Sequence, residues 1–176
     1  MARVTIDLRE RGVRMRLGIL SDTHDNIWKL SEAFAHLQTA DVVIHCGDLC
    51  SPFIVKRMGE ALEEIPIHIV WGNNDGDPLT IARVAAGYPK IALHGQIAKL
   101  NLDGYQVGVN HYPVIATELA QSGNFDLVCY GHDHTVHESK VGACVLLNPG
   151  EVMGMNGRST LAIYDTQTQQ AEIIDL

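Results

Sequence analysis

Side chains able to bind a metal ion occur in five short polar clusters of this 176-residue sequence. Each cluster follows an apolar run that predicts a β-strand, and these strands are expected at 17–21, 42–45, 67–71, 105–110 and 127–130. Ligands of open α/β sheets lie outside the carboxyl ends of the strands, so we expect the clusters to converge on one rim. The candidate ligands are Asp22, His24, Asp48, Asn73, His111, His132 and His134.

These candidates comprise three oxygen donors and four imidazoles. One closed tetrahedral site needs fewer ligands, whereas two ions that share a bridging ligand would use all of them. The absence of cysteine from the set disfavours soft metals, and four imidazoles argue against a purely hard Ca²⁺ or Mg²⁺ site. The residue types therefore indicate two divalent transition-metal ions, with Mn²⁺, Fe²⁺, Zn²⁺, Co²⁺ and Ni²⁺ left open.

Glycine precedes a polar residue in three of the clusters, at Gly47, Gly72 and Gly131. Because glycine has no Cβ, backbone or an ion could approach closely at each of these positions. His45 comes just before one of the clusters, within a buried strand, and we expect it to be a hydrogen-bonded core residue, not a ligand.

Helical patterns alternate with the predicted strands in the first half of the chain. Apolar residues between Ile27 and Leu37 recur at helical spacing, and Asp25 or Thr23 is placed to cap that helix. Further helices are expected at about 52–62, 79–86 and 113–121.

The second half of the sequence indicates hairpins. Asp103-Gly104 between two alternating runs is a strong signal for a two-residue turn. Additional strands are expected at 96–102, 138–147, 159–165 and 171–175. Strand–helix alternation followed by hairpins predicts an α/β fold with mixed sheets, in which two sheets pack face to face with helices outside.

In this order, the motifs resemble those of the calcineurin-like metallophosphoesterases, and most closely the small bacterial and archaeal phosphodiesterases of that family. The resemblance runs from about Met15 to the C-terminus and implies one domain over 15–176, folded as a four-layer α/β/β/α sandwich. The densely charged residues 1–14 are then an N-terminal extension, with an extra strand near Val4–Leu8 left open. The motifs are Leu20-Ser21-Asp22-Thr23-His24, His45-Cys46-Gly47-Asp48, Gly72-Asn73-Asn74-Asp75, His111, Gly131-His132-Asp133-His134 and Asn148-Pro149-Gly150.

The resemblance also implies how the ligands are shared. Asp22, His24 and His134 would hold the first ion, and Asp48 would bridge it to the second. The remaining ligands of the second ion would be Asn73, His111 and His132. Among the open metals we expect Mn²⁺.

The implied reaction is phosphodiester hydrolysis by in-line attack of a metal-bridging hydroxide on phosphorus. Asp48 would keep the two ions close together, and Asp75 is a candidate acceptor that orients a histidine N–H. We expect the catalytic work to fall on Asp48, Asn73, His111 and Asp75.

Three positions depart from the pattern common in the family. Asn74 stands where many phosphatases have the histidine that protonates the leaving group, and an amide cannot supply that proton at pH 7. Such a site should prefer good leaving groups or use water as the acid. Tyr112 follows His111 where glycine is usual, and Glu151 follows Asn-Pro-Gly where serine is common.

Two alternative functions remain. A phosphomonoesterase would use the same chemistry on a different substrate. A non-catalytic interaction scaffold is the other, because the retromer subunit with this fold keeps much of the site but lacks a histidine of the second metal. All seven positions are filled here, which favours an enzyme.

Composition limits the partners and the location. Lys and Arg total 13 against 21 Asp and Glu, giving a formal net charge of −8, so stable binding to nucleic acid is not expected. No run is long enough to span a membrane, and no apolar leader follows the first residues. The four cysteines form no CxxC pair, which fits reduced thiols in the cytoplasm. We expect a small phosphodiester substrate and leave a homo-oligomer open.

Overall fold

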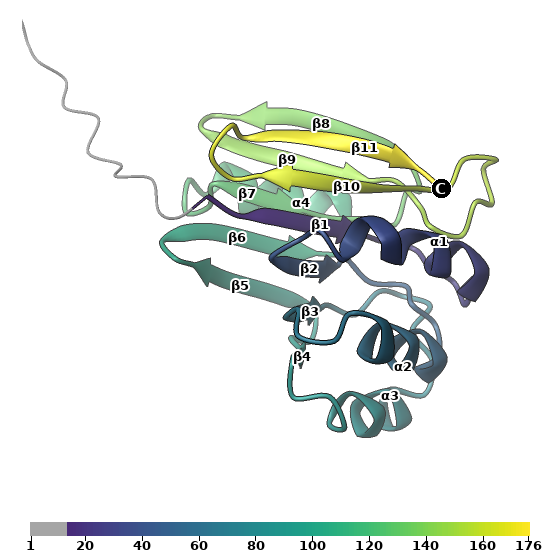
Figure 1. Cartoon of the computed structure of the whole chain (residues 1–176). Helices are drawn as coiled ribbons and strands as arrows, with labels where there is room; N and C mark the ends of the chain where they lie inside the picture. Colours follow the sequence, from purple (N-terminus) through teal and green to yellow (C-terminus); the bar gives the residue numbers. More distant parts are fainter. Residues whose placement is uncertain (1–13) are drawn as a thin grey trace, which may run out of the picture.

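The computed structural model describes residues 14–176, and over this part of the chain two mixed β-sheets are flanked by four helices (Figure 1). Apart from Arg14, the predicted extension and its strand near Val4–Leu8 lie outside the described residues. No helix in the described part of the chain is long and apolar enough to cross a bilayer.

The first sheet has the strand order β11-β10-β1-β2-β3-β4. Strands β1 to β4 run parallel, and β10 pairs antiparallel with both β1 and β11. The carboxyl ends of β1, β2 and β3 therefore lie at one edge. The strands are β1 (Arg16–Leu20), β2 (Val42–His45), β3 (Ile67–Ile69), β4 (Ile91–Leu93), β10 (Thr160–Asp165) and β11 (Gln170–Asp175).

The second sheet has the order β5-β6-β7-β9-β8, with β6, β7 and β9 parallel and the two edge strands antiparallel. Asp103 and Gly104 join β5 to β6 with φ of 49° and 91°, as a two-residue turn with positive φ at both central positions requires. The strands are β5 (Ile97–Leu102), β6 (Tyr105–Asn110), β7 (Leu127–Cys129), β8 (Val136–Val141) and β9 (Cys144–Pro149).

The four helices are α1 (Ile27–Leu37), α2 (Pro52–Ala61), α3 (Pro78–Ala85) and α4 (Pro113–Gln121), counted over residues 14–176. Three begin with proline, whose missing N–H is not needed in a first turn. Asn26 caps α1 by accepting a hydrogen bond from the Lys29 amide, so the prediction of Asp25 or Thr23 as the cap is wrong.

Three buried layers hold these elements together. Leu30 and Ile54 belong to the core between the first sheet and α1, α2 and α3. Ile44 and Val109 belong to the core between the two sheets, and Ala116 of α4 packs on the outer face of the second sheet. This order of layers confirms the predicted α/β/β/α sandwich.

Two strand predictions differ from the structure. β4 is missing from the prediction because Ile91–Leu93 is too short to show a periodicity. The predicted strand 138–147 is two antiparallel strands, because Gly142 adopts a φ of 63° and reverses the chain between Val141 and Cys144.

Candidate metal centre

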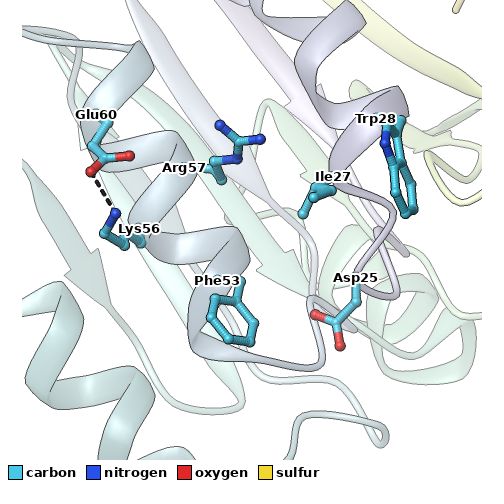
Figure 2. A pocket seen from close by; sticks show the side chains of 7 residues that line it. All are labelled: Asp25, Ile27, Trp28, Phe53, Lys56, Arg57 and Glu60. Carbon is cyan, nitrogen blue, oxygen red and sulfur yellow. Dashed lines mark ion pairs between the residues drawn. The ribbon is translucent and has the colours of Figure 1, made fainter.

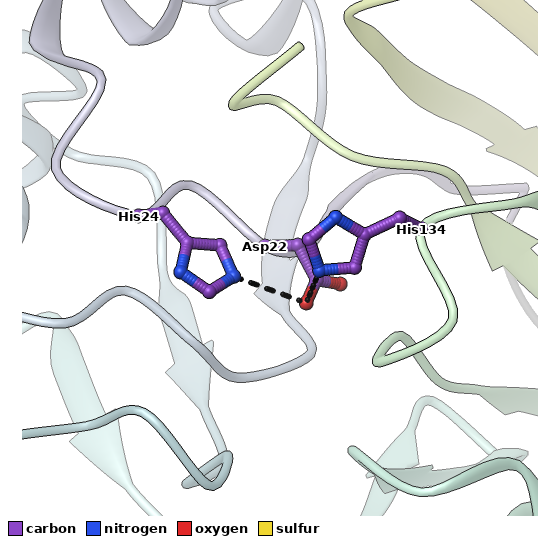
Figure 3. Close-up of side chains that lie close together, drawn as sticks. All are labelled: Asp22, His24 and His134. Atoms are coloured by element: carbon purple, nitrogen blue, oxygen red, sulfur yellow. Dashed lines mark ion pairs between the residues drawn. The ribbon is translucent and has the colours of Figure 1, made fainter. Parts of the chain in front are cut away.

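The seven predicted ligands lie in five loops at one rim of the sandwich, and one half of the set centres on Asp22. Asp22 Oδ1 lies 3.2 Å from His134 Nε2 and 3.6 Å from His24 Nε2 (Figure 3). His24 Nε2 is also 3.5 Å from Asp48 Oδ2. The loops that follow β1, β2 and β7 thus bring four of the ligands together.

The other half of the set centres on Asp48 and Asn73. Asp48 Oδ2 lies 3.4 Å from His111 Nε2. Asn73 Oδ1 is 3.2 Å from the same His111 nitrogen and 2.9 Å from His132 Nδ1. Asp48 therefore stands between the two halves, in contact with one histidine from each.

The arrangement fits a bound cation. Asp22 Oδ1 and His24 Nε2 are buried and have no hydrogen-bond partner among the described residues. Leaving buried polar atoms unpaired is costly, and a metal ion is the kind of partner that two such ligand atoms would share. Ligand atoms lie within 4.8 Å of one another in two groups, Asp22/His24/His134 and Asp22/Asp48/His111.

Glu151 is hydrogen-bonded to the His134 ring nitrogen that faces away from Asp22. Its Oε2 accepts a hydrogen bond of 2.5 Å from His134 Nδ1, and its Oε1 accepts one of 2.6 Å from the Asn156 amide. The side chain is almost fully buried. The sequence shows Glu151 only as a departure after Asn-Pro-Gly, and gives no sign of this contact with a ligand.

Two other histidines are also held through Nδ1. His111 Nδ1 donates to the Cys46 carbonyl oxygen at 2.9 Å, so Nε2 is the nitrogen that faces the oxygens of Asp48 and Asn73. His24 Nδ1 lies 3.3 Å from Cys50 Sγ. Such contacts orient a metal-binding imidazole and fix which nitrogen faces the ion.

Among residues 14–176 Asp75 makes no hydrogen bond to a histidine, so the prediction that it orients a histidine N–H is wrong. Its carboxylate accepts backbone N–H groups of Gly72 at 2.7 Å, Cys50 at 2.9 Å and Asp48 at 3.2 Å. A carboxylate placed between two loops satisfies amides that point inward. Asp75 therefore fixes the backbone that carries Asp48.

Asn74 fixes the carboxylate of Asp48 itself. The Asn74 backbone amide donates to Asp48 Oδ1 at 2.8 Å, and its side-chain amide donates to Oδ2 at 2.7 Å. In the sequence, Asn74 stands out only because it replaces a histidine that could donate a proton. Its two hydrogen bonds to Asp48 are not predicted. The residue contributes to the orientation of the central ligand.

Neighbouring atoms approach all three glycines closely, and backbone is among them at Gly47 and Gly72 as predicted, whereas side chains alone approach Gly131. A Cβ on Gly72 would overlap Asp48 Oδ1, and one on Gly131 would overlap Ser21 Oγ. A Cβ on Gly47 would lie 2.8 Å from His111 Nδ1. Each glycine thus makes room for a ligand or for its immediate neighbour.

Five of the seven ligand positions have a backbone in the left-handed region, which is uncommon for residues other than glycine. Such conformations persist where surrounding contacts fix them, and they concentrate at functional sites. Nothing in the sequence indicates them. The φ angles are 52° for Asp22, 40° for His24, 56° for Asp48, 77° for His132 and 56° for His134.

The two carboxylates are ionised. Burial alone would raise the pKa of Asp48, but hydrogen bonds from His111 and Asn74 outweigh it and hold that pKa well below its usual value. The pKa of Asp22 is likewise lowered, since contacts with His24 and Ser21 outweigh its burial. Negative charge in the cluster suits divalent cations.

His45 and Tyr112 lie beside the ligands. His45 is fully buried, accepts the Gly47 N–H at Nδ1 and contacts Thr23 Oγ1 at 2.5 Å through Nε2, which confirms it as a hydrogen-bonded core residue. Tyr112 packs edge-on against the rings of His111 and His132, with centroids 5.2 and 5.1 Å away.

Comparison with known proteins agrees with this geometry. The calcineurin-like phosphoesterase superfamily domain matches residues 15–169. Phosphodiesterase MJ0936 of Methanocaldococcus jannaschii is 30% identical over 164 residues, which cover 89% of this chain and 96% of that protein. A solved archaeal phosphodiesterase superposes with a TM-score of 0.85 at 28% identity, covering 92% of this chain and all of the other.

A more distant solved structure shares the fold alone. Vps29 of Chaetomium thermophilum superposes with a TM-score of 0.64 at 13% identity, over 92% of this chain and 97% of that one.

Proposed function

This chain belongs to the calcineurin-like phosphoesterase superfamily, and on that premise we propose that it hydrolyses small phosphodiesters with two divalent metal ions. The observation that carries the proposal is the place of Asp48 Oδ2, 3.5 Å from His24 Nε2 and 3.4 Å from His111 Nε2. A carboxylate oxygen between two histidines from different loops is suited to be shared by two ions. We place the site in a single domain, residues 15–176.

The remaining ligands divide between the two ions. Asp22, His24 and His134 would hold one ion, because their ligand atoms lie within 4.8 Å of one another. Asn73, His111 and His132 would hold the other, with Asn73 Oδ1 in contact with both imidazoles. We propose Mn²⁺ as the metal, and the donor set also admits Fe²⁺, Co²⁺, Ni²⁺ or Zn²⁺.

When bound, two divalent ions supply an activated water and positive charge for the phosphate oxygens. In the hydrolysis, the water releases a proton to solvent as its oxygen bonds to phosphorus, the opposite P–O ester bond breaks, and the alkoxide or phenoxide leaves. Asp22 and Asp48 stay ionised and fixed, because Asn74 and the backbone amide of His132 donate hydrogen bonds to them. Asn74 cannot donate a proton, so the leaving group takes one from solvent or departs as a stable anion.

The charge distribution favours a small substrate over a long polyanion. The chain carries a formal net charge of −8, so positive charge enters only locally, with the ions. Attraction for a phosphate is thereby confined to one rim, while the rest of the surface repels a nucleic-acid chain. A phosphomonoesterase would use the same cluster of residues. The rates of hydrolysis of an aryl monoester and an aryl diester distinguish a phosphomonoesterase from a phosphodiesterase.

The test is the variant Asp48→Asn, measured for bis(p-nitrophenyl) phosphate hydrolysis and for bound metal by elemental analysis. We expect hydrolysis to fall by about 100-fold or more and metal content to fall, because a shared anionic ligand is lost. Asp133→Asn is the matched control, since Asp133 Oδ1 accepts hydrogen bonds from Asn148 and Thr135 that an amide oxygen also accepts. Full activity of Asp48→Asn would refute the proposal, and tight partner binding without metal-stimulated turnover would favour the scaffold.

A further inference from the structure

A pocket of about 430 Å³ lies between the first turn of α1 and the side of α2 that carries Phe53, Arg57 and Glu60 (Figure 2). Ile27 and Trp28 line it from α1, and Phe53 lines it from α2. Trp28 is 75% exposed and Phe53 is 69% exposed, which is unusual for large aromatic side chains on the surface of a single chain. The volume lies within the ~300–1,000 Å³ typical of small-molecule sites.

The pocket lies next to the two loops that carry the candidate ligands His24 and Asp48. The loop after β1 and the loop after β2 are tied by backbone hydrogen bonds, His24 N to Asp48 O at 3.1 Å and Asp25 N to Leu49 O at 3.4 Å. Asp25 Oδ1 also accepts from Ser51 N at 3.1 Å and from Ser51 Oγ at 2.5 Å.

The same two loops carry candidate metal ligands and lead directly into pocket residues. Asp25 lines the pocket and directly follows His24, and successive Cα atoms are only about 3.8 Å apart. Phe53 follows Asp48 by five positions at the start of α2. Asp25 is thus the lining residue that stands next to a candidate ligand in the chain, and a substituent on a phosphate held by the ions would reach the pocket past this residue.

The lining has a chemistry suited to a flat aromatic ring. The side chains of Trp28, Phe53 and Ile27 give an apolar surface, and the exposed Arg57 also lines the pocket. Within residues 14–176 Arg57 has no ion-pair partner, whereas the neighbouring Lys56 pairs with Glu60 at 2.8 Å (Figure 2). Aromatic rings and an unpaired guanidinium both stack on the face of a nucleobase.

We propose that this pocket binds the nucleobase of a nucleoside phosphodiester whose phosphate lies on the metal centre. The proposal rests on the proposed phosphodiesterase function and assigns its substrate class. A diester has two organic substituents, and the one that is not expelled needs a binding surface of its own. The pocket provides that surface without the basic strip that a longer nucleic acid requires.

The test compares two diesters with the same p-nitrophenyl leaving group, one carrying a nucleoside and the other an ethyl group. In the metal-loaded protein, Trp28→Ala and Phe53→Ala should raise KM for the nucleoside diester about tenfold, with kcat within about twofold. That effect lies within the contribution of base stacking on an aromatic side chain. KM for the ethyl diester should not change. Leu79→Ala is the control, since Leu79 is 61% exposed on α3 and lies outside the pocket.

A second measurement does not depend on hydrolysis. In a Trp71→Phe background Trp28 is the sole tryptophan, so its fluorescence reports on the pocket. A nucleoside 5′-monophosphate should quench it and ribose 5-phosphate should not. Unchanged KM values, or equal changes for both diesters, would overturn the assignment, as would a change of oligomeric state in the pocket variants. If the wild type hydrolyses neither diester, the proposed function fails, while the fluorescence still decides whether the pocket binds a base.

Discussion

His134 and Glu151 form a hydrogen bond of 2.5 Å between Nδ1 and Oε2. The second oxygen of Glu151 is held by the Asn156 amide at 2.6 Å, so the carboxylate is fixed at both ends. His134 Nε2 is left facing Asp22 Oδ1 at 3.2 Å. A buried anion behind a metal-binding imidazole fixes the direction of the ring and makes its other nitrogen a better donor to the metal.

Replacing Glu151 by glutamine should weaken metal binding. The amide has one oxygen for two donors, His134 Nδ1 and the Asn156 amide, and it carries no charge. We expect the affinity for Mn²⁺ to fall by roughly 10- to 100-fold, the range found when such supporting partners are removed. Titration of the metal-free protein in competition with a chromophoric chelator measures this directly.

Asp133→Asn is the control for that experiment. It removes one negative charge from the same loop, but its side chain bonds to Asn148 and Thr135 and not to a ligand. Its metal affinity should match that of the wild type. Equal affinities for the Glu151→Gln variant and the wild type would show that the carboxylate does not support His134.

The sequence points to the candidate ligands because each of them follows a strand that its apolar run predicts. Glu151 lies 17 positions after His134, and only the folded loops bring the two together. The partners of Asp75 could not be predicted for the same reason, because they are backbone amides of two loops. The sequence gives the identity of a side chain, whereas the direction of a backbone amide depends on how the loops pack.

The elements of the fold also divide into those set by local sequence patterns and those set by tertiary contacts. The amphipathic face of α1 and the Asp103-Gly104 turn depend on local patterns, and both were predictable. β4 has three residues and, among the strands that the structure describes, pairs with β3 alone, so its strand conformation depends on a tertiary contact. The positive φ of His24 or Asp48 has no local signature either, because hydrogen bonds between loops impose it.

Two glycines of one loop give a matched pair of substitutions. A Cβ on Gly72 would overlap Asp48 Oδ1, whereas one on Gly76 would meet the Cys50 carbonyl oxygen at an ordinary 3.7 Å. We expect Gly72→Ala to lower diesterase activity about 100-fold, since misplacement of a reacting group by ~1 Å has that effect. Gly76→Ala should stay within about twofold. Activity and bound metal are measured on samples shown to be folded by circular dichroism, and similar behaviour of the two variants would contradict the role of Gly72.

Asn74→His should change the dependence of the rate on the leaving group. A histidine there can protonate a departing alkoxide, and general acid catalysis contributes on the order of 100- to 10,000-fold for poor leaving groups. We expect the ratio of rates for ethyl phenyl and ethyl p-nitrophenyl phosphate to rise at least about tenfold. Asn74→Ala is the comparison, since it removes the side-chain hydrogen bond to Asp48 Oδ2 without adding an acid. A ratio that stays at the wild-type value in Asn74→His would mean that this position does not reach the leaving group.

His45 should make the stability of the metal-free protein sensitive to acid. Burial lowers the pKa of its imidazole from 6.5 to about 4, with the nearby Asp75 carboxylate opposing this shift. Between those two values the unfolded chain binds a proton that the folded chain does not, so the free energy of unfolding falls as the pH falls through this window. His45→Gln removes the titrating group, and between pH 7 and pH 5 the wild type should lose about 2 kcal/mol more than the variant. Urea unfolding of chelator-treated samples at pH 7 and pH 5 gives the loss in the free energy of unfolding for each protein. Subtracting the loss of the variant from that of the wild type removes the contribution of groups that titrate in both. Parallel losses in the two proteins would show that His45 is already protonated in the folded chain at pH 5.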